Sequence, residues 1–455
     1  MGGDRAGRHG RVVPIEGQLT DDAEPLRLAS PVVIAHNRGS DFHTRPYMTR
    51  KVVITGMGTV NGCGLTVPQT WESVVNGRSG IAPITAFDTT NYLVKIAAEV
   101  KGFDPTAFID MKEARRMDRH QHFAIAATKE ALAQSGLEIT DENADRVAVI
   151  VSSAIGGAKA FQDGVRTLDS VGPRRVDVFM IPKLMSNGAG GLISILTGAR
   201  GPNFSVASAC ASGSDGIGQA WSLIRHGVVD AAIAGAAEAT IIELGVASFD
   251  RTSAMTHRTD GVPQPFDKER DGLVMGEGAA VVVLESEASA HARGATILAE
   301  LAGYSASADS FHITAPSDTG KPGATAIQRA LDSASANADQ VGYINAHGTG
   351  TVLNDASETR AVKLALGHHA SQVPMSSTKS MTGHCMGMTG ALEAILCVKA
   401  IREGVLPPTI HYHTPDPECD LDVVPNVARE ARIDLTLSNA FGFGGHNSVL
   451  AIRRY

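Results

Sequence analysis

The sequence predicts an α/β protein built from two similar halves. From residue 52 to the end of the 455-residue chain, short buried strands alternate with glycine turns and helices. The same order of strand, turn and helix starts again near residue 299, which indicates a duplicated α/β unit. An alternation of this kind is typical of sheets that helices cover on both faces.

Composition limits the class of protein further. Hydrophobic residues make up 43% of the chain and charged residues 19%, which is ordinary for a soluble globular protein, and a net charge of −8 argues against broad nucleic-acid binding. The chain has no run of about 18 apolar residues, so we expect no membrane span. Its five cysteines form no CxxC pair, which favours a reduced, cytoplasmic compartment over a disulfide framework or a zinc ribbon.

The first 47 residues differ from the rest of the chain. They are rich in Arg, Gly, Asp and Pro, contain one short apolar run at 31–35, and lack the apolar segment of a secretory signal. We expect residues 1–47 to be a disordered N-terminal extension and Met48 to be the natural start.

The remainder divides into an expected N-terminal half, residues 48–298, and a C-terminal half, residues 299–455. The apolar stretch 231–249 predicts a strand followed by a loop. The turn and helix after Cys210 correspond to those after His384, and the strand before Gly235 corresponds to the strand before Gly442. Buried strands are predicted at residues 52–54, 146–153, 231–235, 279–284, 341–346, 435–440 and 449–452.

One cysteine lies among small residues just before a predicted helix. Cys210 belongs to the stretch SVASACASGSDG at 205–216, and an amphipathic run follows at 217–224. In the first turn of that helix, unpaired N–H groups and the positive end of the dipole would favour a thiolate, which is a nucleophile. The amide of Cys210 could also help to hold an oxyanion. A small residue in the core is the alternative, and this stretch alone does not decide between them.

Three motifs in the second half add functional groups at strand ends and helix starts. Residues 345–351 read NAHGTGT, residues 377–384 read STKSMTGH, and residues 439–447 read NAFGFGGHN. Taken singly, each has a structural explanation. In open α/β sheets, however, functional groups gather at such positions, and Cys210 lies at one too.

Together these motifs resemble those of the β-ketoacyl-acyl carrier protein synthases, condensing enzymes with the thiolase fold, most closely the synthase II type of fatty-acid elongation. The resemblance covers residues 50–455 and includes ITGMG at 54–58, PFDKERDG at 265–272 and GEG at 276–278. It implies a thiolase-like fold, in which duplicated βαβ halves pack as a five-layer α-β-α-β-α core. The implied activity is decarboxylative condensation of malonyl-carrier protein with an enzyme-bound acyl chain, without metal or cofactor, in a homodimer that binds acyl carrier protein.

The resemblance also assigns roles to residues. Cys210 would accept the acyl chain, His347 and His384 would be the active-site histidines, and the amides of Cys210 and Phe443 would form the oxyanion hole. Both imidazoles would be neutral and would donate hydrogen bonds to the enolate oxygen. Phe443 would also gate the acyl pocket. The resemblance also implies that Lys379 has the acids Asp355, Glu358 and Glu393 around it. Substrate contacts are implied for Thr349 and Thr351 at the pantetheine arm, for Ile155 in the acyl pocket, and for Phe441 and Gly444. The implied carrier-docking cluster consists of Lys112, Arg115 and Arg116, with Arg119 nearby at helical spacing.

Two alternatives stay open at this point. A free-standing ketosynthase of a type II polyketide pathway shares the same cysteine and histidines. A non-catalytic partner subunit that binds acyl carrier protein is disfavoured, because such subunits replace the nucleophile that Cys210 retains.

Overall fold

The computed structural model describes residues 49–258 and 262–455, which belong to one compact unit. The expectations for residues 1–47 and for Met48 lie outside the described residues.

One nine-stranded mixed sheet runs through this unit in the order β4-β5-β6-β1-β7-β13-β12-β8-β9. Every predicted strand is present, and several extend beyond the predicted bounds. The strands of this sheet are β1 (Val52–Asn61), β4 (Val147–Ser152), β5 (Ala231–Glu238), β6 (Gly278–Ser286), β7 (Ala299–Ala308), β8 (Tyr343–Asn345), β9 (Met375–Ser376), β12 (Leu435–Gly442) and β13 (His446–Arg453); two short antiparallel pairs, β2 (Ala82–Pro83) with β3 (Ile96–Ala97) and β10 (Val405–Leu406) with β11 (Arg429–Glu430), lie outside it.

The strand pairing confirms the predicted duplication. In the first group, β1 pairs antiparallel with β6, β6 antiparallel with β5, and β5 parallel with β4. In the second group, β7 pairs antiparallel with β13, β13 antiparallel with β12, and β12 parallel with β8. The groups join where Val53 and Ile54 of β1 pair with Glu300 and Ala299 of β7.

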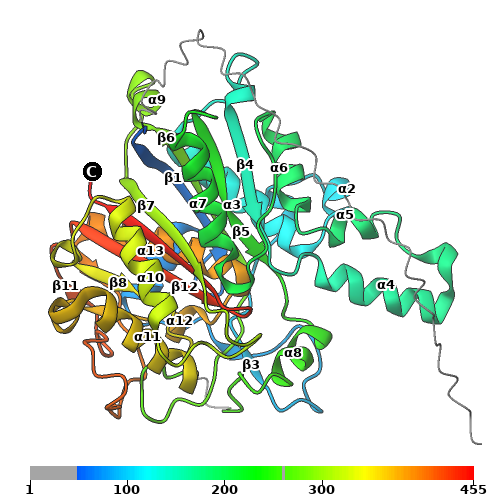
Figure 1. Ribbon diagram of the computed structural model, residues 1–455. Coiled ribbons are helices and arrows are strands. Elements are labelled where there is room, and N and C mark those ends of the chain that lie inside the picture. The colour runs from blue at the N-terminus through cyan, green and yellow to red at the C-terminus, as the bar shows by residue number, and fades with distance from the viewer. Residues whose placement is uncertain (1–48, 259–261) are drawn as a thin grey trace, which may run out of the picture. The chain divides into compact units, whose positions relative to one another are not determined.

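Helices form three layers around the two strand groups (Figure 1). Helices α7 and α13 lie between the groups, α3 and α6 cover the outer face of the first, and α10 with α11 cover the outer face of the second. The expected five-layer arrangement is therefore confirmed. The helices are α1 (Val67–Val75), α2 (Met111–Ala114), α3 (Arg119–Ser135), α4 (Ala158–Val171), α5 (Met180–Leu184), α6 (Gly188–Thr197), α7 (Ser212–Arg225), α8 (Glu243–Asp250), α9 (Glu287–Ala292), α10 (Lys321–Ser333), α11 (Val352–Leu366), α12 (Lys379–Thr382) and α13 (Thr389–Glu403).

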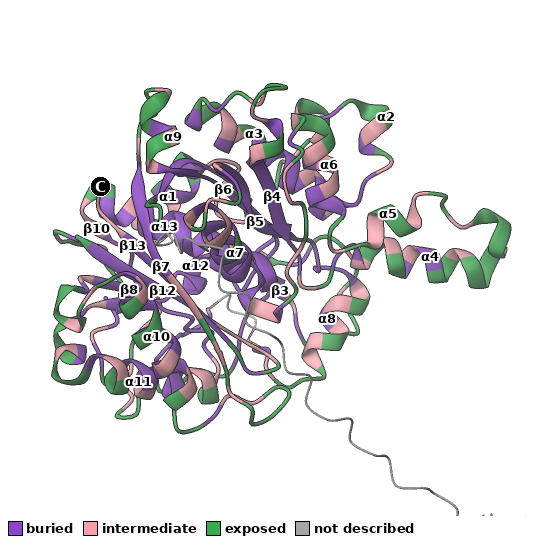
Figure 2. Cartoon of the chain, turned by 45° about the horizontal axis from the view of Figure 1, so that its top comes forward, coloured by how far each residue is buried: buried purple, intermediate pink, exposed green. Residues whose placement is uncertain are grey.

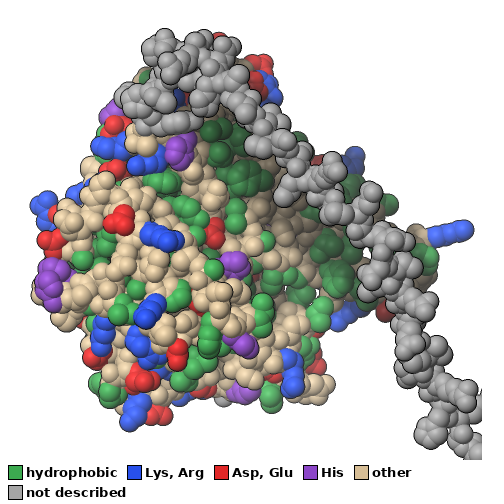
Figure 3. Space-filling view, viewed as in Figure 1, with side chains coloured by type: hydrophobic (Ala, Val, Ile, Leu, Met, Phe, Trp, Pro, Cys, Tyr) green, Lys and Arg blue, Asp and Glu red, His purple; other side chains and the backbone are tan. Residues whose placement is uncertain are grey.

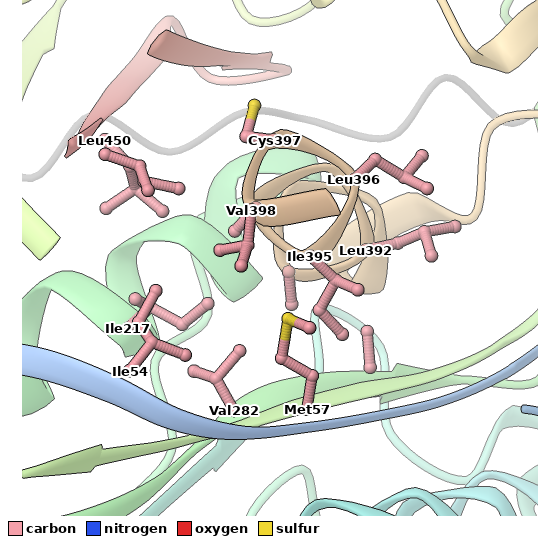
Figure 4. Close-up of a cluster of buried hydrophobic side chains, with 14 of the residues drawn as sticks. Ile54, Met57, Ile217, Val282, Leu392, Ile395, Leu396, Cys397, Val398 and Leu450 are labelled. Carbon is pink, nitrogen blue, oxygen red and sulfur yellow. The ribbon is translucent and has the colours of Figure 1, made fainter. Parts of the chain in front are cut away.

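The strands are buried on both faces, as the purple strands of Figure 2 show. Alternate residues of β6 face opposite layers: Val281 packs on the α3 side and Val282 on the side of α7 and α13. In the central layer, Ile217 of α7 and Leu392 of α13 pack with Val282 in one apolar cluster (Figure 4). Strands covered in this way read as continuous apolar runs, which explains why the sequence revealed them.

Two local expectations were wrong. The segment after β5 contains helix α8 instead of a loop; its Val246 is fully buried, so packing stabilises a helix that the sequence pattern did not indicate. The basic cluster at 112–119 spans two helices, because α2 ends at Ala114 and Asp118 caps the start of α3 in a capping box with Gln121. Across the described ranges 49–258 and 262–455, the helices are too short or too polar to cross a bilayer.

Candidate active site

Cys210 lies in a sharp bend at the start of α7. It is the middle residue of a short 3-10 turn (Ala209–Ala211), and Ala209 adopts a left-handed conformation with φ of 51°. The hydroxyl of Ser212 accepts a hydrogen bond from the amide of Ser208 (3.0 Å) and donates one to the carbonyl of Ala209 (2.7 Å). A Cβ atom at Gly213 would come within 2.8 Å of the carbonyl oxygen of Gly387. The small residues therefore let this turn contact the turn that precedes α13.

The two histidines reach Cys210 from different elements of the second strand group. His347 follows β8, and His384 lies between α12 and the turn Met386–Met388 before α13. The sulfur of Cys210 and one nitrogen of each ring lie within 4.8 Å of one another. The ring centroids are 5.4 Å apart and their planes are nearly perpendicular, at 88°. The structure thus brings the three predicted groups together.

Both imidazoles are neutral at physiological pH. Burial, reinforced by the positive charge of Lys379, lowers the pKa of His384 to about 3. Burial also holds the pKa of His347 well below its ordinary value, and Lys379 and His384 act in the same direction. The amide of Met386 donates to Nδ1 of His384 (3.0 Å), so the neutral ring carries its proton on Nε2. An uncharged ring with a fixed N–H is suited to donate a hydrogen bond to a developing negative charge.

Burial acts against the thiolate expected at Cys210. Burial raises the pKa of the Cys210 thiol to about 11, although hydrogen bonds from the amides of Phe443 and Cys210 and the charge of Lys379 act in the opposite direction. Desolvation of the sulfur therefore outweighs the groups that favour its charged form. This balance predicts a thiol at neutral pH.

The hairpin between β12 and β13 brings a second amide to the sulfur. The turn Phe443–Gly445 connects the strands, and Gly444 and Gly445 have φ of 82° and 74°. At Gly442 a Cβ atom would lie 3.0 Å from the amide nitrogen of Cys210, so glycine permits the close approach. The amides of Phe443 and Cys210 both donate toward the Cys210 sulfur. Two converging N–H groups next to a nucleophile have the composition of an oxyanion hole.

The three predicted acids differ in their contacts with Lys379. Only Glu393 contacts it, with Nζ and Oε1 2.6 Å apart and both side chains buried. Burial raises the pKa of Glu393 to about 7, although Lys379 lowers it. Glu358 instead accepts hydrogen bonds from the amides of His347 (2.8 Å) and Gly348 (2.7 Å).

Asp355 likewise has partners other than Lys379. It accepts hydrogen bonds from the amides of Phe266 (2.8 Å) and Gly350 (3.3 Å) and lies 3.9 Å from Arg270. Glu358 and Asp355 therefore hold the turn that carries His347. Backbone donors pair with both carboxylates because the glycine-rich turn after β8 exposes its N–H groups.

A cavity of about 260 Å³ opens onto the three groups. Phe441 and Phe443 line it, and Thr349 and Thr351 present a pair of hydroxyl oxygens 2.9 Å apart on its wall. Ile155, expected in the acyl pocket, does not line this cavity and is 39% exposed. Cys210, His347 and His384 also have the donor atoms that bind zinc, although the expected condensation chemistry requires no metal.

The predicted docking residues differ in their surroundings. Lys112 and Arg115 are exposed. Arg116 pairs with Glu113 (2.7 Å) and lies over the ring of Phe179, whereas Arg119 forms an ion pair with the buried carboxylate of Glu277 (2.7 Å). Arg119 is therefore a structural residue.

Sequence reasoning missed Glu238 at the end of β5. Burial raises the pKa of its carboxyl group to about 8, while hydrogen bonds from the amides of Ala154, Ile155 and Gly387 lower it. Its charge would raise the pKa of Cys210. The signal in the sequence was an acid within an otherwise apolar strand.

Comparison with known proteins gives consistent matches. Residues 49–290 match the family model "Beta-ketoacyl synthase, N-terminal domain", and residues 298–413 match the corresponding C-terminal domain. The chain is 46% identical over 409 residues to a 3-oxoacyl-[acyl-carrier-protein] synthase 2 of Synechocystis sp., covering 89% of this chain and 98% of the relative. It is 45% identical over 408 residues to the protein of the same name from Staphylococcus aureus strain N315, covering 89% and 99%.

Solved structures match over a similar length. A β-ketoacyl synthase from Burkholderia phymatum STM815 has a TM-score of 0.83 at 34% identity, covering 89% of this chain and 100% of that chain. The ishigamide ketosynthase/chain length factor has a TM-score of 0.84 at 36% identity, covering 90% and 100%. A type II polyketide synthase acyl-carrier protein in complex with its ketosynthase bound to the hexaketide (AntDE:AntF) has a TM-score of 0.83 at 31% identity, covering 90% and 100%.

Proposed function

The chain belongs to the β-ketoacyl synthase family, and on that premise we propose that it is a 3-oxoacyl-[acyl-carrier-protein] synthase of the synthase 2 type. Such an acyltransferase condenses malonyl-carrier protein with an acyl chain held on Cys210 and elongates fatty acids by two carbons. The observation that carries the proposal is the cysteine sulfur within 4.8 Å of two imidazole nitrogens, at a cavity wall.

In the first step, the sulfur of Cys210 attacks the acyl thioester of the carrier protein. A new C–S bond forms to Cys210 as the bond to the carrier sulfur breaks, and the thiol proton of Cys210 passes to the departing carrier sulfur. The amides of Cys210 and Phe443 stabilise the oxyanion of the tetrahedral intermediate. Because the Cys210 pKa is about 11, loss of the thiol proton accompanies attack instead of preceding it.

In the second step, malonyl-carrier protein loses CO2, and the electron pair of the broken C–C bond forms an enolate on the thioester. Nε2–H of His384 and the N–H of His347 donate hydrogen bonds to the enolate oxygen. Their low pKa values keep both rings uncharged, so the donors do not protonate the enolate carbon. The negative charge therefore stays available for carbon–carbon bond formation.

In the third step, the enolate carbon attacks the thioester on Cys210. The same pair of amides stabilises the oxyanion of the tetrahedral intermediate that forms. Collapse of this intermediate releases the 3-oxoacyl product on the carrier protein. The Cys210 sulfur leaves with the electron pair and takes up a proton, which regenerates the thiol. No metal, nucleotide or flavin takes part in this scheme.

Other residues support these steps. Lys379, neutralised in part by Glu393 at 2.6 Å, lowers the pKa of both histidines by its charge. We assign Thr349 and Thr351 to the pantetheine arm because both residues line the cavity and their hydroxyl oxygens lie side by side, 2.9 Å apart. Phe443 is assigned as the gate, with the flanking glycines supplying the freedom to move.

Carrier protein is the proposed partner. Long-range attraction to an acidic carrier cannot come from a chain with net charge −8, so a local patch must provide it. Lys112 and Arg115 are exposed and are the best candidates in the cluster, whereas Arg116 is already paired with Glu113.

A homodimer is proposed from an apolar face. In Figure 3, hydrophobic side chains group beside the arm formed by α4 and α5. Phe161, Val165 and Leu168 follow one another at helical spacing on α4, and all are exposed; Val178 and Ile195 nearby are 84% and 80% exposed. Ile155 lies three residues before the start of α4 at Ala158 and is itself 39% exposed, and we propose that a second copy on this face covers it beside the acyl pocket.

The alternative is a ketosynthase of a type II polyketide pathway. Identity to the synthase 2 relatives (46%) exceeds identity to the type II polyketide synthase structure (31%), which favours fatty-acid elongation. The cytoplasmic location expected from the cysteines stays a prediction, although all five cysteines are free.

An extension assay tests the function. Purified enzyme, malonyl-carrier protein and acyl-carrier primers of graded length should yield 3-oxoacyl products two carbons longer, and Cys210→Ala should yield none. A single extension supports fatty-acid elongation, while repeated extension without keto reduction would support the polyketide alternative. Absence of both products and of a covalent acyl adduct on Cys210 would indicate a non-catalytic carrier-binding subunit.

A further inference from the structure

A tyrosine of the second strand group contacts the helix that carries the nucleophile. Tyr304 lies on β7, paired with Leu450 of β13, and its ring packs against α7. A Cβ atom at Gly218 of α7 would come within 2.3 Å of that ring. Glycine weakens the interior of a helix, so its presence in α7 is explained by the room that the ring requires.

The Tyr304 hydroxyl begins a chain of hydrogen bonds that ends beside Cys210. It donates to Oδ1 of Asp215 (2.9 Å), and the hydroxyl of Ser208 donates to Oδ2 of the same carboxylate (2.5 Å). Asp215 and Ser208 are buried. Burial and the adjacent Asp215 carboxylate raise the pKa of Tyr304, so its hydroxyl stays protonated as a donor. Both oxygens of the carboxylate are thus occupied by hydroxyl donors.

This chain holds a backbone conformation that alanine adopts only at a cost. Ser208 is followed by Ala209 at φ of 51° and then by Cys210. A non-glycine residue in the left-handed region persists where its neighbours fix it. Ser212, in the first turn of α7, holds the bend through hydrogen bonds with the backbone of Ser208 and Ala209. Asp215 holds Ser208, the first residue of the bend, by accepting a hydrogen bond from its hydroxyl. The bend determines where the amide and the sulfur of Cys210 point.

We propose that Asp215 and Tyr304 are positioning residues that hold the Ser208–Ala209 bend, so that the amide of Cys210 stays directed at its sulfur and at the oxyanion. Neither side chain lines the cavity, so they act through Ser208. The proposal rests on the proposed function for its kinetic consequences, but the geometry of the bend can be tested without it.

The experiment compares four variants of the full chain. Tyr304→Phe removes one hydroxyl, and Asp215→Ala removes both acceptors. Asp215→Asn keeps the network, because its amide oxygen accepts from Tyr304 and its NH2 group donates to Ser208. Trp221→Phe is the matched control: Trp221 of α7 donates to the carbonyl of Leu301 on β7 (2.8 Å), so this change also removes one hydrogen bond between the same helix and strand.

Two readouts are measured beside the melting temperature. The first is kcat and KM for condensation; the second is the rate at which iodoacetamide alkylates Cys210 between pH 7 and 10. We expect Tyr304→Phe and Asp215→Ala to lower kcat about tenfold or more with little change in KM, as misplaced reacting groups do. Both should slow alkylation at a given pH, because a displaced amide no longer favours the thiolate. Asp215→Asn should retain most of both rates, and Trp221→Phe should change only the melting temperature.

Equal losses in Tyr304→Phe and Trp221→Phe would overturn the proposal, as would unchanged rates in Tyr304→Phe or an Asp215→Asn variant no better than Asp215→Ala. If Asp215→Ala does not fold, the comparison of Tyr304→Phe with Trp221→Phe still decides. Alkylation needs no acyl substrate, so a wild-type protein that fails to condense would refute the proposed function and leave this test intact.

Discussion

The protonation state of Cys210 gives the sharpest prediction, because two physical effects oppose each other there. The N-terminus of α7 and two amides favour the thiolate, whereas burial favours the thiol. The structure indicates that burial prevails, with a pKa of about 11. Because pH 7 is about four units below this pKa, about one protein molecule in 10⁴ carries a thiolate at Cys210 at that pH.

Raising the pH is therefore the perturbation. Because the thiolate is the reactive form, the rate of alkylation by iodoacetamide should rise about tenfold for each pH unit from 7 to 10, with no plateau in that range. Mass spectrometry locates the adduct, and Cys210→Ala provides the background from the other four cysteines. A rate that levels off below pH 8 would show that the helix N-terminus and the amides outweigh burial, and would refute a thiol resting state.

Three further predictions concern charged groups. Lys379→Met leaves Glu393 buried without its cation and should lower the free energy of unfolding by about 3–5 kcal/mol in urea titrations. Adding Glu393→Gln to this variant should restore part of the lost stability. Equal stability of Lys379→Met and the wild type would contradict the prediction. Glu238 has a folded-state pKa raised from 4.5 to about 8, so its stabilising contribution is complete below pH 4.5, declines between pH 4.5 and 8, and is lost once the pH exceeds about 8. The stability of the wild type relative to Glu238→Gln should fall by about 1.4 kcal/mol per pH unit in that window, and a pH-independent difference would refute it. Charge reversal at Lys112 and Arg115 should raise KM for the acyl carrier protein several-fold but not for acyl-CoA, and an unchanged KM would move the docking surface elsewhere.

Much of the fold could be predicted because its strands are apolar runs that lie next to glycines or contain them. β12 ends at Gly442 and β4 leads into a glycine turn, whereas β6 begins at Gly278 and β5 contains Gly235. The joint between β1 and β7 could not be predicted, since it consists of only two residue pairs. Helix α8 was missed because tertiary burial of Val246, not amphipathic spacing, stabilises it.

The site was predicted in its residue types but not in its electrostatics. Resemblance to a family identified Cys210, His347 and His384, which the fold brings within 4.8 Å of one another. It did not reveal that Glu393 alone pairs with Lys379, because that depends on how α12 and α13 pack. The sign of the Cys210 pKa shift also depends on tertiary structure, since elements of the second strand group bury a sulfur carried by the first.

The contact between the two turns that start α7 and α13 has a wider consequence. A Cβ atom at Gly213 would lie 2.8 Å from the carbonyl of Gly387, and one at Gly390 would lie 2.1 Å from the Ser214 hydroxyl. Not even a methyl group fits between these repeat-related turns. These contacts fix the distance between the two turns that carry Cys210 and His384, so a change in substrate preference is expected on the outer walls of the cavity, where side chains can change size without forcing the turns apart.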